Sequence, residues 1–318
     1  MMIKWGVLGL GGIATRFCES LANFDDACFY AGASFTESKR KAFDEAFHPV
    51  KLYDNYNDML EDDDVDVIYI AVPHGFHYQW IMASLEHGKH VMTEKPATLT
   101  QEDIKTIAAY AKEHHLFFME AMKARFIPLM NLVHQTISEG TIGDITHIEN
   151  HFTFELPYIE NHYMYDVKQG GTLYDAGCYG LAFVQDFIKE DVVDVKVNYV
   201  INYDVDVHQN SHITYANGAT ADCESAIDDP TNKRFGVITG TKGKITMNPF
   251  YRPEHADVEL DDGTSFALDA KYIIDDFHTE IAEVHRCICE GLIESPRMSY
   301  NDSITYIGLM EQIKKAMK

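Results

Sequence analysis

The sequence of 318 residues lacks an apolar run long enough to cross a bilayer, and it is poor in basic residues. A membrane-spanning helix needs about 20 predominantly apolar residues, whereas the longest runs here, such as residues 65–72, are far shorter and include Asp66. Lys and Arg number 26 against 50 Asp and Glu, which gives a formal net charge of -24. Such a charge repels phosphate backbones and anionic membrane surfaces. We therefore expect no nucleic-acid partner and no membrane association.

Cysteine is sparse and unpatterned. The six cysteines are scattered without a C-x-x-C pair, and disulfides are unusual in a reducing compartment. Cys287 and Cys289 fall in an expected helix, where residues two apart point to different faces and do not share a metal ion. The chain enters a short strand at once, without the longer apolar stretch of a secretory signal. We predict a cytoplasmic protein with no bound metal.

Two regions of the sequence have different hydrophobic patterns. Up to about residue 122, short apolar runs alternate with helical patterns, which is typical of strand-helix units on a parallel sheet. Later, apolar residues occupy every second position of residues 193–205, which indicates a strand with one buried face. The strands expected in the first region are residues 3–8, 29–33, 65–72, 90–93 and 116–119. Further strands are expected in the second region at residues 211–216, 220–226, 235–239 and 244–248.

These patterns predict an α/β fold with two domains. Residues 1–122 are expected to form a Rossmann domain with a doubly wound parallel sheet. Residues 123–318 are expected to form an α+β domain with a large open, mainly antiparallel sheet. Its C-terminal helix could pack back on the first domain. Because a wide sheet face rarely stays bare, we expect a homodimer or a larger closed assembly.

A glycine-rich turn follows the first expected strand directly. Residues 9–14 read Gly-Leu-Gly-Gly-Ile-Ala and match the pattern G-x-G-x-x-A. Gly9 permits the tight turn, Gly11 lets a pyrophosphate approach the backbone, and Ala14 allows close packing of helix on strand. Free amides at the start of the helix then face the phosphates. Such turns can also merely connect strands to helices, but the position after the first strand favours an NAD(P) site.

The end of the second expected strand indicates which dinucleotide binds. NAD sites usually carry an acidic residue there, which binds the ribose hydroxyls. Here residues 33–36 read Ala-Ser-Phe-Thr, and the next residue, Glu37, is the first acid. Ser34, Thr36, Lys39 and Arg40 could instead surround a 2′-phosphate, although the two cations could also form a solvated helix face. The pattern favours NADP.

Two further motifs lie in separate regions of the chain. Residues 94–96 read Glu-Lys-Pro, and residues 170–179 read Gly-Gly-Thr-Leu-Tyr-Asp-Ala-Gly-Cys-Tyr. With these motifs the sequence resembles the glucose-fructose oxidoreductase, inositol dehydrogenase and MocA (Gfo/Idh/MocA) family over essentially its whole length. Residues 120–128 and Tyr179 look most like the dimeric dihydrodiol dehydrogenase and D-xylose dehydrogenase branch. Residues 163–165 depart from the family pattern, which often has an Arg there, so the resemblance leaves the substrate open.

The resemblance implies an NAD(P)-dependent dehydrogenase or reductase that acts on CH–OH groups of a sugar, polyol or related diol. It also implies that the domain of residues 123–318 serves substrate binding and dimerisation. Its implied catalytic residues are Lys95, Tyr179 and Asp175. The residues expected to bind the cofactor are Gly9, Gly11, Gly12, Ile13, Ala14, Ser34, Phe35, Lys39, Ala71, Pro73, His74, His77, Glu94 and Lys95.

Hydride transfer to or from a carbinol carbon needs a group that handles the hydroxyl proton and a group that stabilises charge on the oxygen. Tyr179 could exchange the proton while Lys95 orients the oxygen and lowers the pKa of the phenol. Asp175, four residues before Tyr179, would share its helical face and could bind a substrate hydroxyl. The structural alternatives are a core aromatic for Tyr179 and a helix N-cap for Asp175.

Two other functions stay open at this point. One is an NAD-dependent glycosidase that oxidises its substrate transiently, and the other is a non-catalytic regulator that senses NAD(P). The presence of both Lys95 and Tyr179 argues against the regulator.

Overall fold

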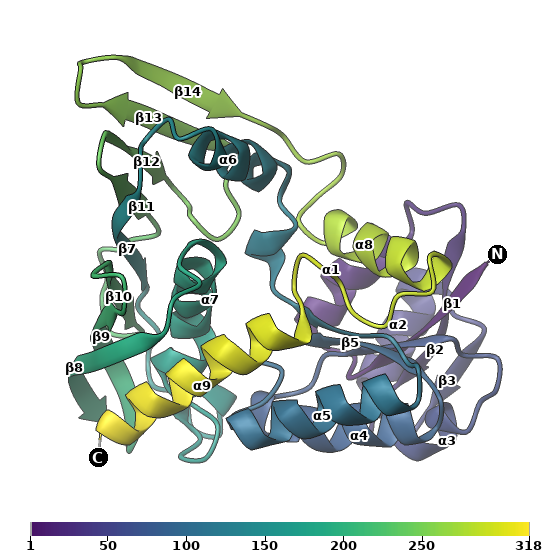
Figure 1. The fold of residues 1–318 in the computed structure, drawn as a ribbon. Coiled ribbons are helices and arrows are strands. Elements are labelled where there is room, and N and C mark those ends of the chain that lie inside the picture. The colour runs from purple at the N-terminus through teal and green to yellow at the C-terminus, as the bar shows by residue number, and fades with distance from the viewer. Residues whose placement is uncertain (1, 318) are drawn as a thin grey trace. The chain divides into compact units, whose positions relative to one another are not determined.

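The computed structural model describes residues 2–317, which form two compact units (Figure 1). The first unit extends to Ala121 and also includes Ile273–Ser303. The second unit consists of Met122–Tyr272 and the chain from Ile304 onward. This division differs from the uninterrupted second domain predicted from residue 123, because residues 273–303 return to the first unit.

Aromatic packing explains this return. The helix of the returning segment, α8 (His278–Cys289), contacts the first helix of the chain, α1 (Gly12–Leu21). The ring of Phe277 meets that of Phe17 edge-on at a centroid distance of 6.3 Å. The indole Nε1 of Trp5 donates a hydrogen bond to Nε2 of His285 at 3.0 Å. Trp5, Phe17 and Phe277 are fully buried, and rings of this size contribute strongly to the stability of a core.

The sheet of the first unit has six strands in the order β3-β2-β1-β4-β5-β6. Each neighbouring pair runs parallel, so the predicted doubly wound sheet is confirmed. The strands are β1 (Ile3–Leu8), β2 (Ala27–Ala33), β3 (Lys51–Tyr53), β4 (Val67–Ile70), β5 (His90–Glu94) and β6 (Phe118–Ala121). The order reverses between β1 and β4, and open α/β sheets bind their ligands outside the carboxyl ends of the strands at such a switch point.

Helices cover both faces of this sheet. Every side chain of β4 is fully buried, as expected for a parallel sheet between two layers of helices. Besides α1 and α8, the helices are α2 (Glu37–Phe47), α3 (Tyr56–Leu60), α4 (His77–Glu86) and α5 (Gln101–Glu113). The side chain of Thr100 caps α5 by accepting a hydrogen bond from the amide of Asp103 at 3.2 Å.

The sheet of the second unit has eight strands in the order β14-β13-β12-β11-β7-β10-β9-β8. The pair β7–β10 is parallel and the other neighbours are antiparallel, so the predicted mainly antiparallel sheet is also confirmed. The strands are β7 (Ile145–Thr153), β8 (Val192–Asn202), β9 (Val205–Tyr215), β10 (Thr220–Ala226), β11 (Gly236–Gly240), β12 (Gly243–Met247), β13 (His255–Leu260) and β14 (Ser265–Asp269).

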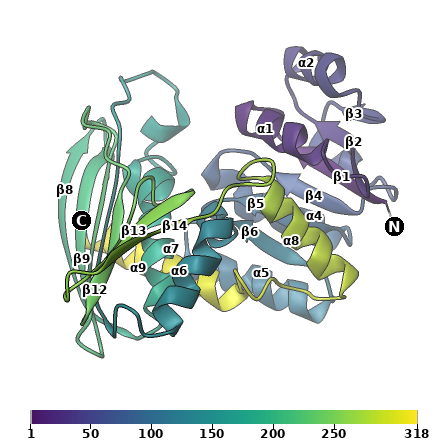
Figure 2. The ribbon, with the colours of Figure 1, turned by 90° about the horizontal axis from the view of Figure 1, so that it is seen from above.

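Helices lie against one face of this second sheet. The views in Figures 1 and 2 place α6 (Pro128–Ser138) and α7 (Cys178–Phe187) on the same side. The last helix, α9 (Tyr300–Ala316), begins in the first unit, and near its end Lys314 forms an ion pair with Asp206 of β9. We call the opposite face of the sheet the outer face. It carries polar side chains such as His151 and Glu224, which are paired in register on β7 and β10.

Strand β8 differs from its prediction. The alternating apolar residues 193–205 were expected to form one strand with a buried face, but β8 is an edge strand, and Tyr199 and Ile201 are 40% and 49% exposed. Tyr203 and Asp204 have φ values of 54° and 62°, as in a two-residue hairpin turn of type I′. The chain therefore reverses there, and Val205 already belongs to β9.

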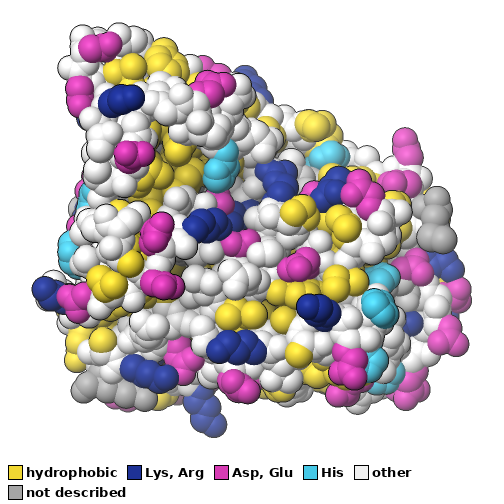
Figure 3. Space-filling model, in the orientation of Figure 1, with side chains coloured by type: hydrophobic (Ala, Val, Ile, Leu, Met, Phe, Trp, Pro, Cys, Tyr) yellow, Lys and Arg dark blue, Asp and Glu magenta, His cyan; other side chains and the backbone are white. Residues whose placement is uncertain are grey.

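The surface mixes charges of both signs. Figure 3 shows acidic side chains interspersed with Lys and Arg on one face of the molecule. None of the helices in the described part of the chain has the length and apolar character that a membrane span needs. Within residues 2–317, no cluster of three or more His, Cys, Asp or Glu side chains is arranged to hold a metal ion.

Candidate active site

The glycine-rich turn connects β1 to α1, as predicted. Gly9 has a φ of +95°, and a Cβ there would lie 2.6 Å from the carbonyl oxygen of Ala71, so the backbone itself requires glycine. Gly11 precedes α1 with extended backbone, and a Cβ there would meet no heavy atom within 4 Å. Ala14 is fully buried. The turn thus leaves open space beside helix-terminal amides that no side chain caps, which is the arrangement that binds a pyrophosphate.

A hollow of about 140 Å³ lies next to this turn, within the first unit. Of the residues predicted to bind the cofactor, seven line it: Gly9, Gly11, Ser34, Phe35, Lys39, Ala71 and Pro73. Gly12 and Ile13 form the first turn of α1 beside it. The hollow therefore lies at the carboxyl ends of β1, β2 and β4, where a doubly wound sheet binds a dinucleotide.

The rim of the hollow that follows β2 is cationic. Ser34 Oγ accepts a hydrogen bond from the amide of Thr36 at 3.2 Å, and Arg40 Nη1 donates to the carbonyl of Ser34 at 2.5 Å. Lys39 is exposed at this rim, and among the described residues that line the hollow none is a carboxylate. Phe35 is 65% exposed, and its ring lies 4.5 Å from that of Tyr56. The chemistry of this rim fits a phosphate better than a pair of ribose hydroxyls.

Lys95 lies in the loop that follows β5, and its neighbours in the loop are held by buried side chains. Tyr69 Oη donates to Glu94 Oε1 at 2.5 Å. Burial, together with the Glu94 carboxylate, raises the pKa of the Tyr69 phenol well above its ordinary value, so the phenol keeps its proton. The amide of Ala97 donates to Glu120 Oε1 at 2.7 Å. Lys95 itself is 8% exposed.

The two predicted histidines lie between β4 and α4. His74 begins a 3₁₀ turn (His74–Phe76) and is 7% exposed. His77 is fully buried, with Nδ1 2.7 Å from the carbonyl oxygen of Pro96 and Nε2 2.7 Å from that of Val72. Burial lowers the pKa of the His77 imidazole, although both carbonyls and Glu94 oppose this effect. Both ring nitrogens of His77 are therefore directed at the protein backbone.

Asp175 and Tyr179 belong to the second unit. Asp175 lies in a π-helical turn (Leu173–Gly177) that continues directly into α7, where Tyr179 is the second residue. The prediction required a helix at Asp175, and one is present. Because a π turn holds more residues than an α turn, however, the two side chains are not aligned as they would be in an α-helix.

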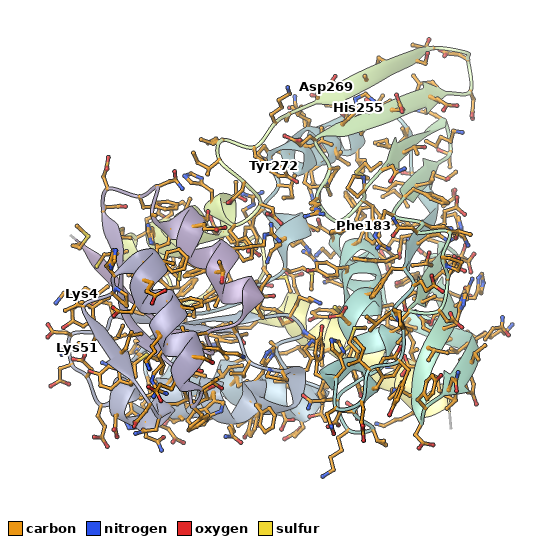
Figure 4. The ribbon with its side chains drawn as sticks, turned by 180° about the vertical axis from the view of Figure 1, so that it is seen from behind. Lys4, Lys51, Phe183, His255, Asp269 and Tyr272 are labelled. Atoms are coloured by element: carbon orange, nitrogen blue, oxygen red, sulfur yellow. The ribbon has the colours of Figure 1, made fainter. Side chains whose placement is uncertain are left out.

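Aromatic rings surround Tyr179. Its ring lies 5.6 Å from that of Phe152 and 5.5 Å from that of Tyr251, and the residue is 9% exposed. Phe183, one turn further along α7 and labelled in Figure 4, packs on Phe250 at 5.2 Å. Gly180 lets the helix approach the sheet, since a Cβ there would lie within 3 Å of the Asn150 amide. Tyr179 is therefore held by packing against the sheet.

Sequence reasoning missed two tyrosines of this site. Tyr163 Oη donates to Asp175 Oδ1 at 3.3 Å. The sequence signal that could have pointed to Tyr163 was the departure of residues 163–165 from the family pattern. Tyr251 follows β12 in the chain, and nothing in its local sequence indicates a contact with α7.

Comparisons with known proteins agree with this geometry. The model of the Gfo/Idh/MocA oxidoreductase family with an NAD-binding Rossmann fold matches residues 3–122, and that of the Gfo/Idh/MocA C-terminal domain matches residues 130–246. D-xylose 1-dehydrogenase (NADP(+)) 2 of Haloferax volcanii is 26% identical over 98% of this chain and 96% of its own length. Trans-1,2-dihydrobenzene-1,2-diol dehydrogenase of Xenopus tropicalis is 25% identical over 98% and 97%.

A solved structure is also similar. It is a 3-ketoreductase from Actinomadura kijaniata in complex with NADP and TDP-benzene, with a TM-score of 0.89 and 27% identity over 99% of this chain and 98% of the other. The two family models describe the fold that the dinucleotide turn and the doubly wound sheet show in this structure. The chain belongs to the Gfo/Idh/MocA family of NAD(P)-dependent oxidoreductases.

Proposed function

We propose that the chain transfers a hydride between NADP and a carbinol carbon of a sugar, polyol or related diol. The observation that carries this proposal is the buried Lys95 at the carboxyl end of β5, in the same unit as the open dinucleotide turn. The names of the similar proteins support the substrate class, because they describe enzymes of D-xylose and of a dihydrodiol.

NADP is the preferred dinucleotide in this proposal. When bound, it supplies the nicotinamide carbon that accepts or donates the hydride. The amides at the start of α1 hold its pyrophosphate, and Ser34, Lys39 and Arg40 hold its 2′-phosphate. Charge-assisted hydrogen bonds of this kind are stronger than neutral ones. Lys39→Ala should therefore weaken NADP binding by about 10-fold and leave NAD binding nearly unchanged, which calorimetry with both cofactors would measure.

Lys95 and Tyr179 act on the proton of the reacting hydroxyl. Tyr179 exchanges this proton with the substrate oxygen, while the Lys95 amine orients the oxygen and lowers the pKa of the phenol. Asp175, which accepts a hydrogen bond from Tyr163, binds a second substrate hydroxyl. The Tyr179 ring stays in place through Phe152 and Tyr251, so the phenol can change its protonation state without moving.

The test is an assay for net cofactor reduction. Pentoses, hexoses, inositols and diols are offered with NADP⁺ and NAD⁺, and the absorbance of the reduced nicotinamide is followed. Net reduction is expected with NADP⁺ and at least one of these substrates. A glycosidase would release sugar without net reduction, and a regulator would bind the cofactor without turnover. Either result would overturn the proposal.

Variants then test the proposed roles. Tyr179→Phe keeps the ring but removes the proton carrier, and Lys95→Met keeps the length but removes the amine. Each should lower turnover by roughly 10²–10⁴-fold. Cofactor affinity should change little in Tyr179→Phe, and the pH dependence of turnover should shift in Lys95→Met. Because the two residues act together on the same proton transfer, the double variant should be little slower than the slower single variant. Multiplicative losses would show that they act independently.

We also propose that two copies of the chain associate through the outer face of the eight-stranded sheet. Apolar side chains of the edge strand β8 are exposed, Val200 at 52%, and an isologous contact would cover them. Sedimentation at micromolar concentration should show a dimer or larger closed assembly, and Val200→Lys should shift it toward the monomer. A monomeric wild-type protein would contradict the proposal.

A further inference from the structure

Three buried residues hold the loop that carries Lys95, and one of them contacts two loops at once. Tyr69 binds the side chain of Glu94, and Glu120 binds the amide of Ala97. His77 instead contacts the backbone on both sides. Its Nδ1 lies 2.7 Å from the carbonyl oxygen of Pro96, the residue after Lys95, and its Nε2 lies 2.7 Å from that of Val72.

These two carbonyls belong to different segments of the first unit. Pro96 follows β5, and Val72 follows the neighbouring strand β4 and lines the dinucleotide hollow. His77 is the first residue of α4, so one buried ring joins a helix to the segments after two adjacent strands. A contact of this kind fixes the distance between the Lys95 loop and the wall of the hollow.

The protonation of the ring decides which contact is a hydrogen bond. A neutral imidazole carries one N–H and can donate to one of the two carbonyls, whereas an imidazolium can donate to both. The titratable groups that act on the ring are Glu94, Lys95 and His74, whose ring centroid lies 5.8 Å away. Because burial lowers the pKa of His77, the neutral form is favoured.

We propose that His77 is a positioning residue, which donates its Nδ1–H to the carbonyl of Pro96 and thereby sets the place of the Lys95 amine. This inference rests on the proposed role of Lys95. It differs from a direct contact with the cofactor, which was expected from the sequence, because both ring nitrogens face backbone carbonyls.

Two amide variants separate the two contacts. The Nδ2 of Asn occupies the place of imidazole Nδ1, and the Nε2 of Gln occupies that of imidazole Nε2. His77→Asn should therefore keep the hydrogen bond to Pro96, whereas the amide of His77→Gln should donate to Val72 instead and leave the Pro96 carbonyl without this bond. Each variant keeps a donor against one of the two carbonyls, so the two variants should have similar free energies of unfolding. His77→Leu loses both contacts, and under conditions in which this variant is folded its kcat shows the effect of removing the ring nitrogens altogether.

The expected result is a difference in kcat between the two amide variants. His77→Asn should retain kcat within about 3-fold, and His77→Gln should lose about 10–100-fold, the equivalent of one buried hydrogen bond. The KM for substrate and the Kd for NADP should change little in both. If the Kd for NADP instead rises in step with the loss of kcat, His77 has a cofactor-binding role. Equal kcat values in the two variants would overturn the assignment.

A second readout needs neither cofactor nor substrate. Reductive methylation with formaldehyde, followed by mass spectrometry, measures how readily the Lys95 amine reacts. The rate should rise several-fold in His77→Gln and stay near the wild-type value in His77→Asn. Lys41, exposed on α2 and paired with Glu37, is the control lysine and should react equally in all proteins. Equal Lys95 rates would overturn the inference, while an inactive wild type would overturn only the proposed function.

Discussion

In the parallel sheet of the first unit every side chain of β4 is fully buried, whereas in the antiparallel sheet burial alternates along β9 and is lost toward the end of β8. The first sheet has helices on both faces and the second on one. In the first unit the candidate ligand site lies beyond the carboxyl ends of the strands. Function and stability should therefore be separable there.

The largest expected effect tests this separation at the dinucleotide turn. Gly11→Val should weaken NADP binding by at least about 100-fold, because the side chain would fill the space through which the pyrophosphate approaches. The fold should survive, since a Cβ at Gly11 meets nothing within 4 Å. Calorimetry with NADP and urea unfolding would measure the two effects. Unchanged NADP affinity would contradict the assignment of the turn.

Gly9→Val is the matched control for this variant. Gly9 has a φ of +95°, and its Cβ would collide with the Ala71 carbonyl. This variant should therefore lose stability and cofactor binding together. Comparing the two variants shows whether two glycines of one motif serve different purposes, one for the fold and one for the ligand.

The next effect compares the strands of the two sheets. Ile68→Ala in β4 removes a fully buried side chain and should lower the free energy of unfolding by about 2–5 kcal/mol. At a protein concentration low enough to keep the chain monomeric, Val200→Ala in β8 removes a side chain that is 52% exposed and should cost about 0.5 kcal/mol or less. Both Trp residues, Trp5 and Trp80, belong to the first unit. Their fluorescence reports on Ile68→Ala, and far-ultraviolet circular dichroism reports on Val200→Ala.

The same comparison explains what the sequence could predict. Apolar runs located five of the six strands of the first sheet, because those strands are largely buried and local composition and burial agree. The short edge strand β3, which was not predicted, is only half-buried. The alternation of residues 193–205 predicted a strand correctly but not its burial. Burial depends on what covers the face, and β8 lies at the edge of the sheet. The hairpin at Tyr203 and Asp204 was missed because neither residue is the glycine that usually indicates such a turn.

The candidate site divides in a similar way. The turn at Gly9 and Gly11 could be located in the sequence because the backbone geometry of a dinucleotide turn restricts the residue types over a few positions. The buried residues that hold the Lys95 loop were not found in that role. His77 lies 19 positions from Pro96, and Glu120 lies 23 positions from Ala97. Such partners meet only once the sheet has formed.

A smaller effect is expected on the outer face of the second sheet. Burial alone would raise the pKa of the Glu224 carboxyl, but hydrogen bonds from His151, Lys233 and His208 outweigh it and lower the pKa below 4.5. The ionised carboxylate therefore stabilises the folded state above pH 4.5, and this contribution is lost as the pH falls through the lower folded pKa.

Glu224→Gln isolates this contribution. The variant should be less stable than the wild type by about 1–2 kcal/mol near pH 6, and the difference should shrink as the pH falls below 4.5 and vanish once the folded wild-type carboxylate is protonated too. Urea unfolding of both proteins at one protein concentration and several pH values measures it. A difference that stays constant with pH would show that the carboxylate charge is not what stabilises this face.

The smallest expected effect concerns the hairpin of β13 and β14. His255 and Asp269 are paired in register there and are labelled in Figure 4. His255 Nδ1 lies 2.8 Å from Asp269 Oδ1, and Nε2 lies 3.2 Å from Asp257 Oδ1. Hydrogen bonds to these two carboxylates raise the pKa of the imidazole above 6.5. The pair therefore stabilises the hairpin below pH 6.5, and this contribution is lost as the pH rises through the folded pKa.

Titration of the His255 ring by NMR is the sharpest measurement, because an exposed ion pair contributes little to global stability. The midpoint should lie above 6.5 in the wild type and move down in Asp269→Asn, with the remaining shift due to Asp257. Added salt should also move the midpoint down, since screening weakens exposed pairs. Asp269→Asn should not alter unfolding followed by Trp fluorescence, because both Trp residues belong to the other unit. A wild-type midpoint at or below 6.5 would show that this edge of the sheet is too mobile to hold the pair.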